Sequence, residues 1–206
     1  MEFRDVLRRR RMVRNYRPEP VEGETIERIV RTVRRAPSGG FSQGQRLLVV
    51  TDAATREALA ALAGEEEYLA KGYEAWISRA PVHIVVCTRE EDYHERYRQP
   101  DKLRAGEEIV WPVPYWYVDA GAAMMLLLLA AIDEGLVAGV FGVLEEQLDP
   151  LKRLLGLPED FHFVAVVTLG LPADDAAWSK ATSRATRGRK ELDEIVRWER
   201  WSPAGE

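Results

Sequence analysis

The sequence is poor in cysteine, in histidine and in hydrophobic runs long enough to cross a membrane. Its one cysteine, Cys87, excludes an internal disulfide. The longest apolar stretch, AGAAMMLLLLAAI at residues 120–132, lies between Asp119 and Asp133 and is shorter than the roughly 20 residues that a spanning helix needs. We therefore expect a buried helix there, and no membrane partner. No secretory signal pattern opens the chain, so a reducing cytoplasm is the expected location.

Several common nucleotide and metal signatures are also absent. The three histidines, His83, His94 and His162, show no ligand spacing, so we expect no metal site. No G-x-G-x-x-G motif opens a strand–helix unit, which leaves a dinucleotide-binding Rossmann domain unsupported. Cys87 lies inside an apolar run and is interpreted as inert packing, although the sequence does not exclude a Cys/His pair.

A phosphate-binding P-loop is suggested only by the spacing of Gly39 and Gly44. The following residues are Gln45-Arg46 instead of the required Lys-Ser/Thr, and the segment precedes a predicted strand rather than following one. The sequence therefore predicts no P-loop NTPase.

Positive charge is concentrated near the start of a chain whose formal net charge is −5. The segment Arg8–Pro18, RRRRMVRNYRP, carries six arginines. Guanidinium groups are always ionised, and their forked donors match phosphate oxygens. The segment therefore indicates a local anion site, with a solvated, salt-bridged helix face as the alternative. An isoelectric point near 5.4 argues against a general nucleic-acid binder.

The hydrophobic pattern places these arginines where a helix ends. Phe3, Val6 and Leu7 have helical spacing before the run, and an apolar/polar alternation begins at Val13. The guanidiniums are expected at a helix-to-extended junction. If the helical turn persisted, Arg10 and Arg14 would converge.

The remaining pattern predicts one sheet covered by helices on both sides, in a single domain of residues 1–206. A loop or lid rich in aromatic residues is expected at about 90–118, and a C-terminal extension at about 175–206. The extension ends with Trp198 and Trp201, which we expect to pack on a partner subunit. Helices are predicted at 24–36, 52–63, 65–79, 120–132 and 147–155, and strands at 45–51, 82–88, 136–143 and 163–170.

Three motifs, taken in order, resemble the FMN-dependent nitroreductase family along nearly the whole chain. They are Arg10–Tyr16 (RRMVRNY), matching an Arg-Arg-Ser-x-Arg-x-Phe element; Ala36–Gln43 (APSGGFSQ), matching Ala-Pro-Ser-x-x-Asn-x-Gln; and Asp119–Ala123 (DAGAA), matching Asp-x-Gly-Ala-Ala before a buried helix. Leu154–Glu159 and Thr168–Pro172 are similar to the family's late helix end and last strand.

The resemblance implies an α+β fold with a central, mostly antiparallel sheet flanked by helices, in an intertwined homodimer with an extended C-terminal tail. It implies an oxidoreductase that passes electrons from NADH or NADPH through FMN to a small organic acceptor, such as a nitro compound or a quinone, by a ping-pong mechanism. The flavin carries the chemistry, so no catalytic side chain is expected. Two alternatives remain. One is a flavin-sequestering protein without turnover, and the other is a protein whose arginines bind a nucleic acid or another acidic partner.

The resemblance also assigns cofactor-binding residues. Arginines from both ends of the chain would surround the FMN phosphate and ribityl group: Arg10, Arg11, Arg14, Arg187 and Arg189. A second set would contact the flavin from the other subunit: Pro37, Ser38, Gly39 and Gln43. Backbone at Phe141 and Gly142 would face the flavin N5 atom. Two positions depart from the family pattern, because Met12 replaces a phosphate-contacting Ser and Phe41 replaces an Asn that holds the flavin.

Overall fold

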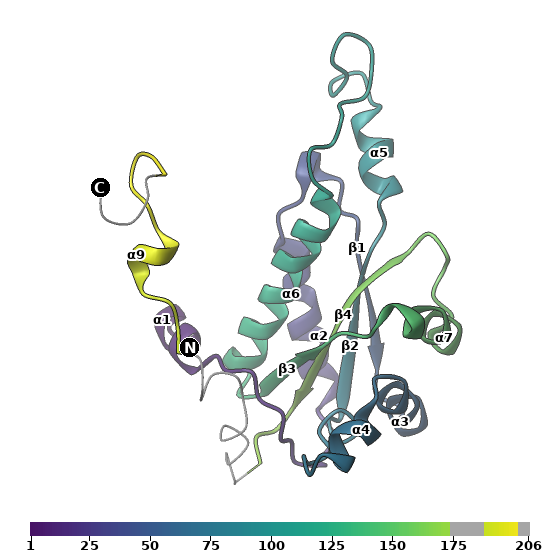
Figure 1. Ribbon diagram of the computed structural model, residues 1–206, viewed down its shortest axis with the longest axis vertical. Coiled ribbons are helices and arrows are strands. Elements are labelled where there is room, and N and C mark those ends of the chain that lie inside the picture. Colours follow the sequence, from purple (N-terminus) through teal and green to yellow (C-terminus); the bar gives the residue numbers. More distant parts are fainter. Residues whose placement is uncertain (174–187, 202–206) are drawn as a thin grey trace. The chain divides into compact units, whose positions relative to one another are not determined.

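The larger part of the molecule is built around a four-stranded antiparallel sheet with the strand order β1-β2-β4-β3 (Figure 1). The computed structural model describes residues 1–173 and 188–201, which fall into two compact units that divide after Ala173. The strands are β1 (Gln45–Val50), β2 (Val82–Thr88), β3 (Val137–Phe141) and β4 (His162–Gly170). The predicted α+β class with a mostly antiparallel sheet is confirmed.

Helices cover both faces of this sheet, as the sequence predicts. Figure 1 shows α2 and α6 on one face and α3 and α7 on the other. The helices of the larger unit are α1 (Phe3–Arg9), α2 (Gly23–Arg31), α3 (Ala53–Leu62), α4 (Glu65–Ala70), α5 (Glu91–Tyr97), α6 (Tyr115–Asp133) and α7 (Glu145–Leu155), with short 3₁₀ turns η1 (Thr32–Arg35) and η2 (Gly39–Phe41).

Strand β2 is buried along its whole length, which is why its sequence is nearly continuously apolar. Ile84 and Val86 join the cluster formed with α2 and α6, and the alternate residues of the strand point to the opposite face. Cys87 belongs to that opposite face, and burial raises the pKa of its thiol to about 11. This agrees with the interpretation of Cys87 as inert packing.

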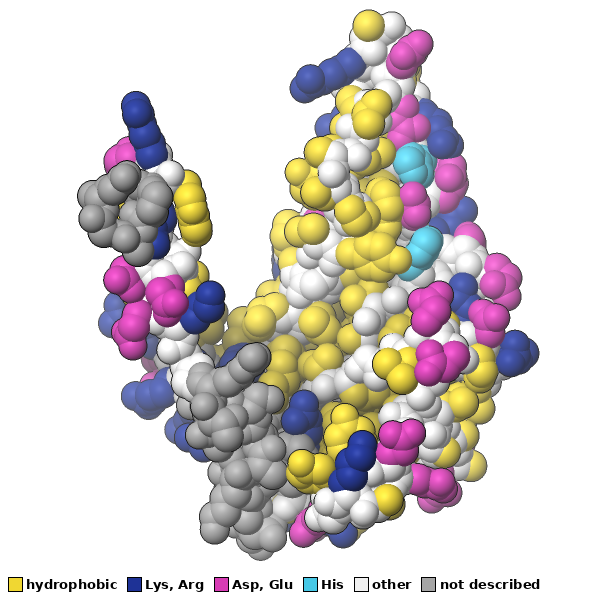
Figure 2. Space-filling model, viewed as in Figure 1, with side chains coloured by type: hydrophobic (Ala, Val, Ile, Leu, Met, Phe, Trp, Pro, Cys, Tyr) yellow, Lys and Arg dark blue, Asp and Glu magenta, His cyan; other side chains and the backbone are white. Residues whose placement is uncertain are grey.

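Helix α6 is buried on one side and open on the other. Ala120, Ala123 and Leu127 are fully buried, whereas Val118 and Met125 are 57% and 45% exposed. Figure 2 shows hydrophobic side chains gathered along this helix. Among the described residues, α6 is the one helix whose length and composition would suit a membrane span, although its inner face packs on the sheet. Within the described residues, the predicted burial of this helix is therefore confirmed for its inner face only.

Two predicted segments differ from the structure. The helix expected at 65–79 ends at Ala70, and the chain turns at Gly72, whose φ of +81° is left-handed. The loop expected at 90–118 contains α5 and the first residues of α6, so only residues 98–114 lack helix. The aromatic residues of this stretch favoured a loop or lid, but Tyr93 and Trp116 are buried and anchor α5 and α6 in the core.

The second unit is described from Gly188 to Trp201. It contains the short helix α9 (Leu192–Ile195). Trp198 and Trp201 are 83% and 77% exposed. Their packing on a partner subunit stays a prediction. Arg187 lies outside the described residues.

Candidate functional site

The arginine-rich segment leaves its helix and lies along the outer edge of the sheet. Helix α1 ends at Arg9, and Arg10 already has an extended ψ of 118°. Met12 forms a bridge with Ala138 of β3, and the Val13 backbone N–H donates to the Ala138 carbonyl at 2.8 Å. The predicted helix-to-extended junction is confirmed. The alternative in which the helical turn continues and brings Arg10 and Arg14 together is wrong.

A close backbone approach at Gly139 holds this segment in place. A Cβ atom at Gly139 would lie 2.6 Å from the Val13 carbonyl oxygen, far inside contact distance. The buried Tyr16 hydroxyl donates to that same carbonyl at 2.7 Å and lies 2.7 Å from Thr168 Oγ1. Burial raises the pKa of Tyr16, so its hydroxyl keeps its proton. Only glycine at position 139 permits this docking.

Two neighbouring charges on the docked segment are not balanced by a carboxylate among the described residues. Arg10 and Arg11 form no ion pair there, whereas Arg8 pairs with Asp5. The Arg14 guanidinium lies over the ring of Trp76, with its carbon 5.1 Å from the ring centre. The adjacent guanidiniums of Arg10 and Arg11 produce a positive potential that attracts anions such as phosphate.

The end of β3 lies beside this segment. Phe141 is buried and meets Trp76 edge to face at 5.9 Å. Gly142 follows it and is exposed, and a Cβ atom there would meet nothing within 4 Å. The structure thus brings Arg14, Phe141 and Gly142 into one region through Trp76, with open space against the backbone. A flat ring with a phosphate tail fits this donor set and this open glycine.

The second group of predicted site residues, Pro37–Gln43, forms a tight and strained loop. Three residues within a stretch of four have left-handed φ values: Gly40 at +59°, Phe41 at +62° and Gln43 at +54°. Phe41 and Gln43 carry side chains, so this conformation is unfavourable at both positions. Phe41 is nevertheless 74% exposed, so its own packing does not explain the strain.

Hydrogen bonds from several elements hold the loop in this conformation. The Gly39 backbone N–H and the Tyr93 hydroxyl both donate to Asp119 Oδ2 at 2.8 Å. Arg96 Nε donates to the Gly40 carbonyl at 2.9 Å, and the Gln43 N–H donates to Ser38 Oγ at 3.0 Å. Asp119 is buried on α6, so the loop is fixed to the core of the molecule.

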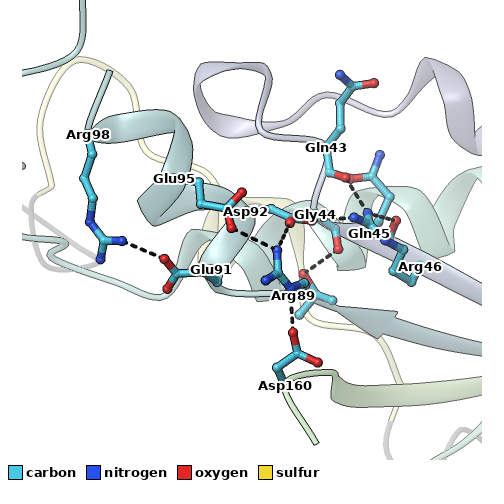
Figure 3. A network of polar contacts seen from close by, with 11 residues as sticks. Gln43, Gly44, Gln45, Arg46, Arg89, Glu91, Asp92, Glu95, Arg98 and Asp160 are labelled. Atoms are coloured by element: carbon cyan, nitrogen blue, oxygen red, sulfur yellow. Dashed lines mark hydrogen bonds and ion pairs between the residues drawn. The ribbon is translucent and has the colours of Figure 1, made fainter. Parts of the chain in front are cut away.

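An ion-pair network supports the exit of this loop (Figure 3). The Arg89 backbone N–H donates to the Gly44 carbonyl at 2.9 Å, while its guanidinium contacts Asp92 and Asp160, each at 2.6 Å. Arg46 contacts the same Asp92 at 2.6 Å. Hydrogen bonding to Arg89 lowers the pKa of Asp160. Arg46 and Arg89 are thus paired with carboxylates, unlike Arg10 and Arg11, which form no ion pair with a described residue.

The two groups lie at opposite ends of the sheet within one chain. The loop leads into Gln45, which pairs with Thr88, whereas Gly139 is aligned through Thr168 with His83 at the other end of β2. The length of β1 separates them, roughly 16 Å at about 3.3 Å per residue. One chain does not bring Pro37–Gln43 to the arginine segment. Arg189 lies in the second unit, so its predicted place beside the phosphate stays a prediction.

Sequence reasoning missed four residues that shape this region: Tyr16, Trp76, Tyr93 and Gly139. The sequence places Gly139 inside the strand predicted at 136–143 and Tyr16 at the end of the Arg10–Tyr16 motif, and neither position signals a docking role by itself. Nothing near Trp76 in the sequence indicated a role, because its partner Arg14 lies 62 positions earlier. Among the described residues, no group of three or more His, Cys, Asp or Glu could hold a metal ion.

The sequence and the fold were compared with those of known proteins, and the sequence matches a protein family. Residues 7–171 match the family model described as "Nitroreductase family". The chain is 31% identical over 182 residues to an Archaeoglobus fulgidus protein whose name combines NADH dehydrogenase and NAD(P)H nitroreductase, covering 85% of this chain and 88% of that one. It is 30% identical over 181 residues to a 5,6-dimethylbenzimidazole synthase from Rhodobacter capsulatus, covering 82% of each.

The fold has solved counterparts. The NADPH:FMN oxidoreductase from Vibrio harveyi, in complex with NAD⁺, superimposes with a TM-score of 0.71 at 22% identity, covering 97% of this chain and 78% of that one. At this level of identity, the likeness concerns the fold alone.

Proposed function

Because the chain belongs to the nitroreductase family, we propose that it is an FMN-dependent oxidoreductase. It takes electrons from NADH or NADPH and passes them to a small organic acceptor such as a nitro compound or a quinone. Donor and acceptor would react in turn with one bound flavin, which is a ping-pong mechanism. FMN, when bound, supplies the hydride and electron chemistry, and the protein supplies position and electrostatics.

The observation that carries this proposal is the docked arginine segment. Arg10 and Arg11 have no ion-pair partner among the described residues, and the segment is fixed to β3 beside the open backbone of Gly142. A phosphate monoester carries about −1.5 to −2 charges at neutral pH, so several guanidiniums suit it. Nucleic acid needs a much more extended basic surface. A mononucleotide matches both the local charge and the adjacent open backbone.

Each part of the site has a role in this proposal. Arg10 and Arg11 bind the phosphate, with Arg187 and Arg189 as further candidates. Arg14 holds positive charge near the edge of the ring where negative charge accumulates on reduction. Backbone at Phe141 and Gly142 lies against the ring. Met12, at the position of the family's Ser, offers no hydroxyl, a loss of about 1 kcal/mol that the clustered arginines offset.

The proposed active form is a homodimer. The loop Pro37–Gln43 and the arginine segment lie at opposite ends of the sheet in one chain, so a second copy is needed to bring one loop to the other chain's arginines. The open face of α6, with Val118 and Met125 exposed, is a suitable surface for that contact. Light scattering coupled to size-exclusion chromatography should give twice the chain mass.

The direct test is the colour and the reduction of the purified protein. We expect yellow protein that releases flavin on denaturation and whose flavin absorbance bleaches when NADH or NADPH is mixed with it under anaerobic conditions. Adding a quinone or a nitroarene should restore the absorbance. Colourless protein that takes up no FMN would contradict the proposal, and the pyridine nucleotide that bleaches faster identifies the donor.

One observation favours the second candidate, a flavin-sequestering protein. Phe41 presents a ring that is 74% exposed from a strained and firmly held loop, and such a ring could occupy the face that an acceptor needs. Bound FMN that is bleached by neither nucleotide would support sequestration. Bleaching of bound FMN in the Phe41→Asn variant, but not in the parent protein, would identify Phe41 as the obstacle.

A further inference from the structure

A buried carboxylate lies outside the residues assigned to the flavin site. Glu65, the first residue of α4, is only 5% exposed. Its Oε1 atom accepts hydrogen bonds from the backbone N–H groups of Trp76 at 2.7 Å and Ile77 at 2.6 Å, and from Ser78 at 3.3 Å. A carboxylate is costly to bury, and these donors compensate for that cost. Glu65 therefore fixes the backbone of residues 76–78.

The same short segment is held from its other side by a histidine. His83 of β2 is fully buried, and its Nε2 atom lies 2.8 Å from the Ile77 carbonyl oxygen. Burial lowers the pKa of His83 to about 4, so the ring is neutral at pH 7 and Nε2 donates its hydrogen to that carbonyl. Glu65 and His83 thus bind the N–H and C=O groups of one segment from two different elements.

This segment carries Trp76, which lies between two parts of the proposed flavin site. The Trp76 side chain is 4% exposed. Its ring faces the Arg14 guanidinium, 5.1 Å from the ring centre, and meets the Phe141 ring edge to face at 5.9 Å with an interplanar angle of 87°. Arg14 comes from the docked N-terminal segment and Phe141 from the end of β3. One indole therefore joins the two.

We propose that Trp76 is a positioning residue that sets the orientation of the Arg14 guanidinium beside Phe141, and that Glu65 and His83 hold Trp76 for this purpose. The inference rests on the proposed function, since Arg14 is taken to face the flavin. An arginine on an extended segment has many side-chain orientations, and a ring against its guanidinium restricts them before the ligand arrives. Ordering the guanidinium in advance increases affinity for the ligand.

Simple core packing does not account for this arrangement. A tryptophan that only fills volume needs apolar neighbours, whereas Trp76 faces a guanidinium, and its backbone is fixed by a buried carboxylate. Tyr73 provides the contrast within the same stretch of chain. It is 39% exposed and packs on Tyr68 at 6.0 Å. Because its ring packs on Tyr68 and is largely open to solvent, Tyr73 serves as the matched control.

The test is a double-mutant cycle on the full-length protein. Apoprotein is titrated with FMN for the parent, Trp76→Leu, Arg14→Gln and the double variant, and the midpoint potential of bound flavin is measured for each. We expect Trp76→Leu to weaken FMN binding about tenfold, the size of one lost cation–π contact. In the Arg14→Gln background the same change should have no further effect. Trp76→Phe should recover most of the affinity, and Tyr73→Leu should match the parent.

The midpoint potential separates positioning from packing. Trp76→Leu should make the potential more negative when Arg14 is present, and leave it unchanged in the Arg14→Gln background, because only a held guanidinium stabilises reduced flavin. If Trp76→Leu proves unfolded by circular dichroism, Glu65→Gln is compared in the two backgrounds in the same way. We expect it to weaken FMN binding about threefold with Arg14 present.

Two results would overturn the inference in distinguishable ways. Equal losses from Trp76→Leu in both backgrounds, or a loss matched by Tyr73→Leu, would show that Trp76 acts only through the fold and would leave the proposed function intact. Parent protein that binds no FMN would remove the proposed function, and the positioning role with it.

Discussion

The proposed site has two halves, the arginine segment Arg8–Pro18 and the loop Pro37–Gln43, and different kinds of contact hold each in place. The arginine segment is attached to β3 through backbone contacts and one buried hydroxyl, and Arg10 and Arg11 keep their charges free of ion pairs with described residues. The loop Pro37–Gln43 is attached through charged side chains, with Asp119 and Arg96 among them, and its own residues are uncharged. The first half therefore presents positive charge to a ligand, and the second presents an uncharged backbone of fixed conformation.

This difference follows from what each half would have to bind. Carboxylates placed beside Arg10 or Arg11 would stabilise the free protein and would compete with a phosphate for the same donors. Neutral contacts dock the segment without that competition. A loop that contacts a flat ring needs a fixed conformation instead, and buried charged hydrogen bonds such as those of Asp119 hold left-handed residues that would otherwise relax.

The largest expected effect comes from removing the charge of the first half. Replacing Arg10 and Arg11 together by Gln should weaken FMN binding at least about 100-fold, because each hydrogen bond from a charged donor contributes about 1.5–3 kcal/mol. Riboflavin, which lacks the phosphate, should bind both proteins equally. The measurement is a fluorescence titration of apoprotein with each flavin.

The control for this prediction replaces two exposed arginines of η1, Arg34 and Arg35, in the same way. This pair should leave the affinity for FMN unchanged. Equal losses for FMN and riboflavin in the Arg10/Arg11 variant would mean that these residues do not contact a phosphate.

Acid should act on the two halves with opposite sign. Burial lowers the pKa of His83, beside Phe141, to about 4. Because the unfolded chain binds this proton near pH 6.5 and the folded chain does not, the free energy of unfolding should fall by about 3 kcal/mol as the pH drops from 6.5 to 4. Urea denaturation across this range measures the slope, which His83→Gln should reduce.

His94, near the loop half, is expected to do the reverse. Burial alone would lower its pKa, but Glu108 and Glu90 outweigh that effect and raise it. The stabilisation by His94 is therefore complete below the unfolded pKa and is lost as the pH rises through the raised value. Hydrogen exchange corrected for intrinsic rates should show β2 near His83 weakening in acid while α5 does not. Uniform weakening of both would contradict this assignment.

One added Cβ atom at position 139 should disrupt the docking of the arginine segment on β3. Gly139→Ala places a methyl group 2.6 Å from the Val13 carbonyl oxygen and 2.8 Å from the Tyr16 hydroxyl. We expect a loss of about 1–3 kcal/mol in the free energy of unfolding, as for other overpacked sites, together with weaker FMN binding. Gly23→Ala, where a Cβ meets nothing within 4 Å, is the control for urea denaturation. An unchanged Gly139→Ala variant would show that the segment is not held there.

The smallest effect is expected at the anchor of the second half. Asp119→Asn keeps one acceptor but loses the charge that receives the Gly39 N–H and the Tyr93 hydroxyl. The free energy of unfolding should fall by about 1–2 kcal/mol, and affinity for FMN and riboflavin should fall together, about three- to tenfold. If the affinity fell for FMN but not for riboflavin, Asp119 would act on phosphate binding, which would contradict the assignment of Asp119 to the loop half.

Local patterns were sufficient to predict most of the elements. The apolar run at Val82–Thr88 predicted a strand, which the structure contains as β2. The helix predicted at 52–63 is present as α3, and the Asp52 side chain before it accepts from the Thr55 N–H at 2.9 Å. Residues 65–79 show the limit. Helical spacing continues past Ala70, but tertiary contacts from Glu65 hold residues 76–78 in another conformation.

The parts of the site that escaped prediction depend on contacts between distant residues. Arg14 and Phe141 were assigned by resemblance, yet Trp76, which touches both, lies in a segment without a motif. The exclusion of any side chain at position 139 is a property of the docked Val13 carbonyl, not of the sequence around Gly139. Similarly, the strain at Phe41 becomes visible only once its φ is known.

The N-terminal segment also closes a sheet edge. β3 is an outer strand, and an uncovered outer strand is a template on which other chains can add and aggregate. Because Met12 and Val13 occupy the free side of Ala138, the segment that carries the proposed phosphate-binding arginines also blocks that template. Shortening the chain past Tyr16 should therefore reduce solubility as well as flavin content, linking cofactor retention to resistance against self-association.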